Sequence, residues 1–278
     1  MGDANGAMMA ASFVNIAGYR FVALPDRDEL REPLRQHCQS LGLLGTILLS
    51  HEGINFFLSG KQEAIDGFLD HLERDERFID IPIKVSYSED CAFRKMNVRL
   101  KKEIISMGME EIKPAEFTGP TISPQEFKQW LDEGRDVTVL DTRNDYEIRL
   151  GTFENAVDFD ISTFRAFPEA VENSTLDKQK PVVMFCTGGI RCEKASAVML
   201  NAGFEDVRQI EGGILGYFEE VGGAHWNGDC FVFDRRVAVD PELNVTNVEV
   251  CFACREPLTL EEQKSEHYVI GESCPHCI

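Results

Sequence analysis

The sequence predicts a protein of the α+β and α/β classes in three parts: a ferredoxin-like N-terminal domain, a doubly wound parallel-sheet domain and a small cysteine-rich segment. Three observations predict this division. Up to about residue 90, apolar strands and helices follow one another as βαββαβ. Short buried strands then alternate with helices, which is typical of a parallel sheet. The last thirty residues hold four cysteines in two close pairs.

The composition sets limits on function. With 278 residues, 43% apolar and 27% charged, the chain is long and apolar enough to fold around more than one core. The net charge of −20 disfavours attraction of a polyanion by the whole surface, so any contact with nucleic acid must be local. No apolar run reaches the roughly 20 residues of a membrane span, and the first residues do not resemble a secretory signal. Nine cysteines are too sparse for a disulfide scaffold, which favours a reducing, cytoplasmic location.

The N-terminal part predicts a ferredoxin-like, acylphosphatase-like domain over residues 12–98. Leu30, Leu34 and Cys38 recur at helical spacing, and Gly42 is placed to end that helix. We expect strands over 12–24, 45–50, 54–60 and 81–90 and helices over 25–42 and 61–78, with a hairpin turn at residues 51–53.

A basic strip follows, in residues 91–102. It contains no acidic residue and five cations, Arg94, Lys95, Arg99, Lys101 and Lys102. In an otherwise acidic chain this is the best local site for the phosphates of RNA. A solvated strand edge, where lysine discourages edge pairing, explains the same residues equally well.

The parallel-sheet domain is predicted over residues 120–224, after a proline- and glycine-marked linker at 99–119. Ser123 with Glu126 forms a capping-box pattern at the start of its first helix. Asp141 and Arg143 end one predicted strand, where ligands of parallel sheets bind. They fit an acid-base pair beside the site and a structural salt bridge equally well.

The most distinctive feature is the sulfur loop, residues 186–191, between a buried strand and a helix. It reads Cys186, Thr187, Gly188, Gly189, Ile190 and Arg191. Loop N–H groups, the helix N-terminus and a guanidinium near the rim would stabilise a thiolate, a persulfide or a substrate oxyanion. A buried cysteine ending a strand is the ordinary alternative.

Two further readings concern this loop. Cysteine phosphatases need five residues between cysteine and arginine to hold a tetrahedral phosphate, whereas four separate Cys186 from Arg191. The smaller loop suits a single sulfur atom better.

Cys192, at the start of the helix, fits a resolving thiol that condenses with an oxidised Cys186, or a packed residue.

The C-terminal segment, residues 225–278, has the spacing of a zinc ribbon. Its ligand candidates are Cys251, Cys254, Cys274 and Cys277, in the pattern CxxC-x19-CxxC. A zinc ion held by four thiolates would be structural, because no position stays open for water. A metal-free thiol cluster, two disulfides, or His276 as a replacement ligand are the alternatives.

The motifs also carry a family resemblance. The segments VLDTRNDYEI, CTGGIR and EGGILGYFEE resemble a rhodanese domain over roughly residues 120–222. Together with GYRFVAL, HEGINFFLSG, FRKMNVRLKKEI, CTGGIRCEK and the paired cysteines, nearly the whole chain resembles the tRNA uridine(34) hydroxylase family. The resemblance implies that Cys186 is the active-site cysteine, that it passes through a persulfide or another oxidised state, and that molecular oxygen makes 5-hydroxyuridine at the wobble position.

From the resemblance we expect a cytoplasmic RNA-modifying oxidoreductase. Cys186, Arg191 and Cys192 would be catalytic, and the basic strip would hold the anticodon stem-loop of tRNA. No flavin or nicotinamide fingerprint and no histidine-carboxylate iron triad is evident. A thiosulfate or persulfide sulfurtransferase, and a non-enzymatic rhodanese-fold module that binds RNA, are the rival readings.

Overall fold

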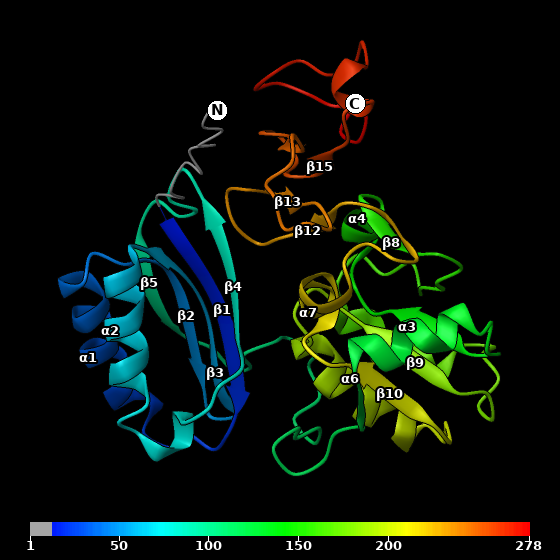
Figure 1. Ribbon diagram of the computed structural model, residues 1–278, viewed down its shortest axis with the longest axis horizontal. Helices are drawn as coiled ribbons and strands as arrows, with labels where there is room; N and C mark the ends of the chain where they lie inside the picture. The colour runs from blue at the N-terminus through cyan, green and yellow to red at the C-terminus, as the bar shows by residue number, and fades with distance from the viewer. Residues whose placement is uncertain (1–12) are drawn as a thin grey trace, which may run out of the picture.

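The structure is a computed structural model that describes residues 13–278. Two sheet domains lie side by side, and a loop-rich C-terminal segment packs at one end of them (Figure 1). The opening residues, which we expected not to form a secretory signal, and residue 12 lie outside the described part. Among the described residues, no helix combines the length and apolarity needed to cross a bilayer.

The N-terminal domain is built on a five-stranded sheet of order β4-β1-β3-β2-β5. Its strands are β1 (Phe13–Phe21), β2 (Leu44–Ser50), β3 (Gly53–Gly60), β4 (Ile83–Ser88) and β5 (Met96–Leu100). The first four pair antiparallel in the ferredoxin-like order, which confirms that prediction. β5 adds to the edge, parallel to β2.

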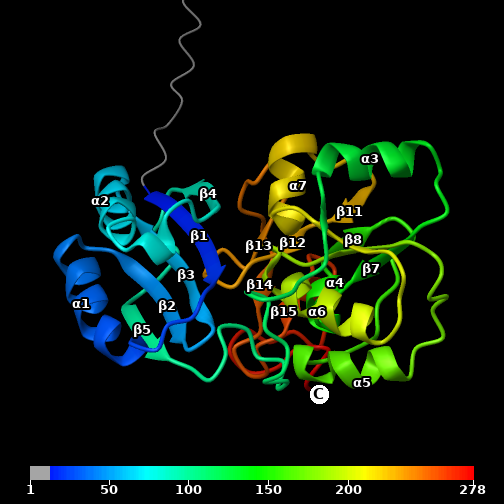
Figure 2. The same ribbon diagram turned by 90° about the horizontal axis from the view of Figure 1, so that it is seen from below.

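Helices cover only one face of this sheet (Figure 1). They are α1 (Arg27–Ser40), α2 (Gln62–Leu72) and the short η1 (Glu76–Phe78). Ile47, Phe56 and Phe68 are fully buried between the sheet and the helices. As predicted, Gly42 follows α1 with a positive φ of 71°. The opposite face of the sheet turns toward the second domain (Figure 2).

The second domain contains a four-stranded parallel sheet of order β6-β10-β9-β7. Its strands are β6 (Thr121–Ile122), β7 (Thr138–Asp141), β9 (Val182–Phe185) and β10 (Val207–Ile210). Its helices are α3 (Pro124–Asp132), α4 (Asp145–Ile148), η2 (Phe164–Ala166), α5 (Phe167–Glu172), α6 (Ile190–Asn201) and α7 (Gly213–Val221).

Both faces of this sheet are covered, which confirms the doubly wound prediction. Val182 and Met184 of β9 pack into the core formed with α5 and α6. Val183 and Phe185 point the other way, into the core formed with α3 and α7. The Ser123 hydroxyl caps α3 by accepting from the Glu126 N–H at 3.2 Å, as its position predicts.

Short strands and loops complete the chain. They are β8 (Gly151–Phe153), β11 (Trp226–Gly228), β12 (Cys230–Phe231), β13 (Ala238–Val239), β14 (Glu249–Val250), β15 (Pro257–Leu258) and η3 (Glu262–Lys264). The C-terminal segment has a small core of its own around Cys251, Leu258 and Cys274. Such a core is too small to hold the segment folded without further support.

The linker packs tightly onto the second domain. β5 pairs with β2 as far as Leu100, so the predicted boundary at residue 98 falls inside a strand. The fully buried ammonium of Lys194, in α6, lies 2.7 Å from a Glu103 carboxylate oxygen and 2.8 Å from one of Glu52. Because Glu52 belongs to the β2–β3 turn, this buried triad ties the N-terminal sheet, the linker and α6 together.

Candidate active site

The sulfur loop connects β9 to α6 and closes around one atom. Gly189 has φ 96°, a conformation that glycine adopts without strain, and its N–H donates to Cys186 Sγ at 3.2 Å. Gly213, at the start of α7, packs against the sulfur loop. A Cβ at that position would lie 2.4 Å from the Cys186 carbonyl oxygen, so only glycine fits.

The surroundings of Cys186 favour the thiolate. Cys186 is 1% exposed, and burial alone raises the pKa of its thiol. The hydrogen bond with Cys192, the charge of Arg191 and the N–H groups of Arg191 and Cys192 outweigh burial and lower that pKa to about 6. The sulfur is therefore anionic at neutral pH.

Cys192 is the protonated thiol beside the Cys186 thiolate. Burial raises the pKa of its thiol well above the usual value, and the hydrogen bond with Cys186 and the negative charge there raise it further. The Thr142 hydroxyl lies 3.7 Å from Cys192 Sγ on the other side. The two buried sulfurs therefore form a thiolate–thiol pair.

The pairing leads to a first prediction, for the pH dependence of alkylation. In the wild-type chain the iodoacetamide rate at Cys186 should reach half its maximum near pH 6, because the thiol protonates below that value. Cys192→Ala removes the donor and should raise this midpoint by about one to two pH units.

The matched control is Cys192→Ser, whose hydroxyl still donates and which should stay near the wild-type midpoint. Peptide mass spectrometry would follow Cys186 separately from the other thiols. A wild-type midpoint near the ordinary value of about 8.5 would contradict the proposed thiolate.

Arg191 lines the cavity with the loop and is paired with a buried carboxylate. Its side chain is buried, and two of its nitrogens lie 2.5 and 2.8 Å from the carboxylate oxygens of Glu147. Glu147 is itself fully buried in α4. The guanidinium is therefore fixed in orientation, and Glu147 offsets part of the charge that acts on Cys186.

Asp141 and Arg143 form a structural salt bridge away from the sulfur. Their side chains are fully buried and 2.6 Å apart. Arg143 also donates to the Gly151 carbonyl at 2.6 Å, and Asp141 accepts from the Thr152 hydroxyl at 2.8 Å. These bonds hold β8 beside the sheet, which favours the structural reading of the two left open by the sequence.

An interdomain cavity of about 790 Å³ lies between the uncovered face of the N-terminal sheet and the sulfur loop. The loop side contributes all six residues from Cys186 to Arg191. The sheet side contributes residues from four strands, among them Ala17, Tyr19, Leu48, Phe57 and Lys84. The N-terminal domain therefore forms one wall of the reactive site.

Tyr19 and Glu193 meet across this cavity. The Tyr19 hydroxyl donates to Glu193 Oε1 at 3.2 Å, although the two residues are 174 positions apart. Sequence reasoning missed both of them and Glu147. The available signals were that Tyr19 lies in GYRFVAL and Glu193 in CTGGIRCEK, two of the motifs that carry the family resemblance.

The basic strip lies at the outer edge of the same sheet. All five of its cations are exposed. Val98 packs under the helices, so its neighbour Arg99 projects on the cavity side, beside Leu48 of β2. Arg27 and Arg31 of α1, which the sequence did not single out, donate to the carbonyls of Lys101 and Val98 and extend the basic surface.

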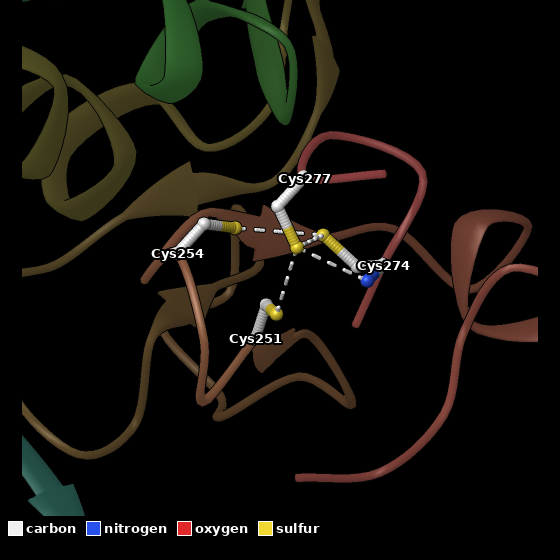
Figure 3. Close-up of side chains that lie close together, drawn as sticks. All are labelled: Cys251, Cys254, Cys274 and Cys277. Atoms are coloured by element: carbon white, nitrogen blue, oxygen red, sulfur yellow. Dashed lines mark hydrogen bonds between the residues drawn. The ribbon is translucent and has the colours of Figure 1, made fainter. Parts of the chain in front are cut away.

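The four C-terminal cysteines form one cluster (Figure 3). Their sulfurs all lie within 4.8 Å of one another, including 4.0 Å from Cys251 to Cys277 and 3.5 Å from Cys254 to Cys274. Four thiolates around a tetrahedral zinc are about 3.8 Å apart, whereas a disulfide bond is about 2.05 Å long. The cluster can therefore bind a metal ion. His276 faces Glu262 at 2.7 Å instead, so it is not part of the cluster.

Comparison with known proteins agrees with this architecture. Residues 13–104 match the family model described as a UPF0176 acylphosphatase like domain, and residues 123–220 match that of the rhodanese-like domain. The chain is 55% identical to a Cupriavidus necator protein named tRNA uridine(34) hydroxylase, covering 95% of this chain and 96% of that one.

Further relatives have the same name. A Cupriavidus taiwanensis protein is 55% identical and a Ralstonia nicotianae protein 50% identical, each covering 95% of this chain and 96% of the relative. Identity at this level over almost the full length, together with both family-model matches, leads to one conclusion. The chain belongs to the tRNA uridine(34) hydroxylase family.

Proposed function

We propose that this protein hydroxylates uridine 34 of tRNA to 5-hydroxyuridine, with Cys186 as the reacting protein group. The observation that carries the proposal is a thiolate with a pKa of about 6 at the wall of a cavity of about 790 Å³. The N-terminal sheet forms the opposite wall of this cavity, and one edge of that sheet is basic. The names of the relatives support the same reaction.

The proposed reaction uses molecular oxygen and two thiols. One oxygen atom of O₂ forms the new bond to C5 of uracil in place of hydrogen, and the other leaves as water. Reduction of that second atom takes two electrons, which formation of a Cys186–Cys192 disulfide supplies. Cys192 gives one proton and solvent gives the other, because Cys186 starts as a thiolate. An external thiol then reduces the disulfide.

The sulfur loop stabilises the anionic states in this sequence. The main-chain N–H groups of Gly189, Arg191 and Cys192 point at the sulfur, and the Arg191 guanidinium adds a fixed positive charge. Thr187, Gly188 and Ile190 complete the loop that positions these groups. A persulfide on Cys186, the sulfur state typical of sulfur transfer, is the alternative oxidised state. Asp141 and Arg143 are assigned a supporting, structural role, because they hold β8 beside the sheet.

The test is a nucleoside profile of tRNA from a strain that lacks this protein and every redundant route to the modification. Return of the wild-type gene should restore 5-hydroxyuridine at position 34, measured by mass spectrometry. A profile that the gene does not change would refute the proposed function.

The basic strip is proposed to hold the phosphates of the anticodon stem-loop, with Arg94, Lys95, Arg99, Lys101 and Lys102 as its contacts. A single-stranded loop base is the suitable target because it is already partly unstacked. β5, which carries part of this strip, is the edge strand of the N-terminal sheet and pairs with β2, whose residues line the cavity.

We expect Arg99→Ala to weaken binding of an anticodon stem-loop RNA about threefold to tenfold and to lower the salt slope by about one. Fluorescence anisotropy at several salt concentrations measures both. The control Lys128→Ala removes a cation from α3, outside the cavity and the strip. Equal losses from the two substitutions would argue against a specific phosphate contact.

We propose zinc as the metal of the cysteine cluster, held by Cys251, Cys254, Cys274 and Cys277. Four sulfur donors at tetrahedral spacing suit zinc, and the ion would stabilise a segment whose own core is small. Free thiols and thiolate ligands require a reducing compartment, so we place the protein in the cytoplasm.

Purified protein should contain one zinc per chain. Cys274→Ser should reduce zinc content roughly tenfold or more and speed hydrogen exchange in residues 225–278. His276→Ala, in the same turn but bonded to Glu262, should retain the metal. Elemental analysis measures the zinc content of each variant. Full zinc content in Cys274→Ser would contradict the assignment of zinc to the cysteine cluster.

The same proposal assigns the parts of the chain. The N-terminal domain, expected over residues 12–98 and extended through Leu100 by β5, positions RNA. The remainder of the 99–119 linker joins the domains, residues 120–224 carry the chemistry, and residues 225–278 form the metal-binding segment. The family-model matches at 13–104 and 123–220 support this division.

A further inference from the structure

The Tyr19–Glu193 pair is the polar feature of the cavity that the proposed chemistry leaves unused. Tyr19 belongs to β1 of the N-terminal domain, and Glu193 belongs to α6 of the second domain. Both line the cavity beside the sulfur loop. A Cβ on Gly189 would lie 3.0 Å from the Tyr19 hydroxyl, so the phenol stands directly over that loop.

The two groups have fixed and opposite roles. Burial, the nearby Glu193 carboxylate and the sulfur of Cys186 all raise the pKa of Tyr19, so its hydroxyl remains a hydrogen-bond donor. Glu193 Oε1 accepts from it at 3.2 Å. On its other side Glu193 reaches Gln209, whose Nε2 lies 3.4 Å from Oε2. The Tyr19 donor thus stands over the sulfur loop, and the Glu193 acceptor lies beside it.

This order matches one edge of uracil. If C5 faces the sulfur, the next ring substituent is the O4 carbonyl, an acceptor, and the one after it is N3–H, a donor. On binding, the Tyr19 proton would turn from Glu193 to O4, and Glu193 would accept from N3–H. One internal hydrogen bond is exchanged for two to the base. Cytosine in the same orientation presents a donor and then an acceptor. Its N3 lone pair would face the Glu193 carboxylate with no proton between them, and the Tyr19 hydroxyl would have to accept from the N4 amino group instead of donating.

The sheet also connects this position with the basic edge. Strand register places Tyr19 opposite Asn55, Asn55 opposite Leu48, and Leu48 opposite Arg99. Three strand spacings separate Tyr19 from Arg99, about 14 Å. RNA whose backbone is held at Arg99 therefore has its next few bases within reach of the cavity. Phe233, 48% exposed and lining the same cavity, offers an aromatic surface for a neighbouring base.

We propose that Tyr19 and Glu193 form the base-reading pair of this enzyme, selecting uracil over cytosine at the position presented to Cys186. The inference rests on the proposed function and extends it to the residues that choose the base. It assigns the N-terminal domain a part in specificity as well as in phosphate binding.

The test compares two anticodon stem-loop RNAs that differ only in U or C at position 34. Binding to the full-length chain is measured by fluorescence anisotropy at one salt concentration. The wild type should prefer the U34 loop, and Tyr19→Phe should reduce that preference about tenfold, because it loses one base contact but keeps the ring. Glu193→Gln, whose amide can also donate, should improve binding of the C34 loop.

Tyr87→Phe is the matched control. Tyr87 is 56% exposed on β4 and does not line the cavity, so its loss should leave the preference unchanged. A wild type that restores the modification in cells but binds both loops equally overturns the proposal. So does a Tyr19→Phe chain that keeps the wild-type preference. Failure of the wild-type gene to restore 5-hydroxyuridine would instead count against the proposed function itself.

Discussion

Cells whose only copy of this protein has Cys186→Ala should contain no detectable 5-hydroxyuridine at position 34 of tRNA. The substitution removes the one sulfur that the loop N–H groups and Arg191 hold as an anion. Loss of a reacting nucleophile lowers turnover by on the order of 10⁴-fold or more. Mass spectrometry of tRNA nucleosides, with redundant routes deleted, gives the measurement.

Two companion variants make this result specific. Cys186→Ser keeps the size and polarity of the side chain but not the redox chemistry of sulfur, so it should be equally inactive. Cys38→Ala removes a fully buried thiol from the core of the N-terminal domain and should retain the modification, provided that protein levels are matched. Undiminished 5-hydroxyuridine in Cys186→Ala would refute the catalytic role of the thiolate.

Glu147→Gln should lower the free energy of unfolding of the second domain by about 3–5 kcal/mol. Glu147 is fully buried and is the carboxylate that pairs with Arg191, so the variant removes the carboxylate partner of a buried guanidinium. Urea unfolding followed through Trp226, which is buried in this domain, provides the measurement.

A surface pair and a double variant provide the comparison. Glu116→Gln breaks an ion pair whose carboxylate side chain is 71% exposed, and should change stability by less than about 1 kcal/mol. Glu147→Gln combined with Arg191→Met removes both charges and should recover most of the lost stability. A single Glu147→Gln as stable as the wild type would show that Glu147 does not compensate Arg191.

Much of the fold could be predicted because its signals are local. Val182 to Phe185 are apolar at every position, which is typical of a strand covered on both faces, and the structure buries all four. In the N-terminal domain, helical spacing and the glycine after α1 predicted α1, and the ferredoxin-like order followed from the element sequence. An edge strand was one of the two readings of the basic strip, and β5 forms such an edge. Its parallel pairing with β2 could not be predicted, because the two strands are far apart in the chain.

The candidate site divides in the same way. The sulfur loop and the cysteine cluster depend on residues close together in the chain, and spacing alone predicted their shape. The burial of Arg191 against Glu147 could not be predicted, because Glu147 lies 44 residues away on another helix. A buried counter-charge makes burial of the guanidinium possible.

The chain by itself therefore determined which residues surround the Cys186 sulfur locally, since turn geometry, glycine conformation and ligand spacing act over a few residues. Tertiary structure decided what faces that atom. Tyr19 reaches Glu193 across 174 residues only because the uncovered face of one sheet packs against the loop of the other domain. The buried Lys194 triad and the linker fix that packing, and no hydrophobic period along the chain encodes it.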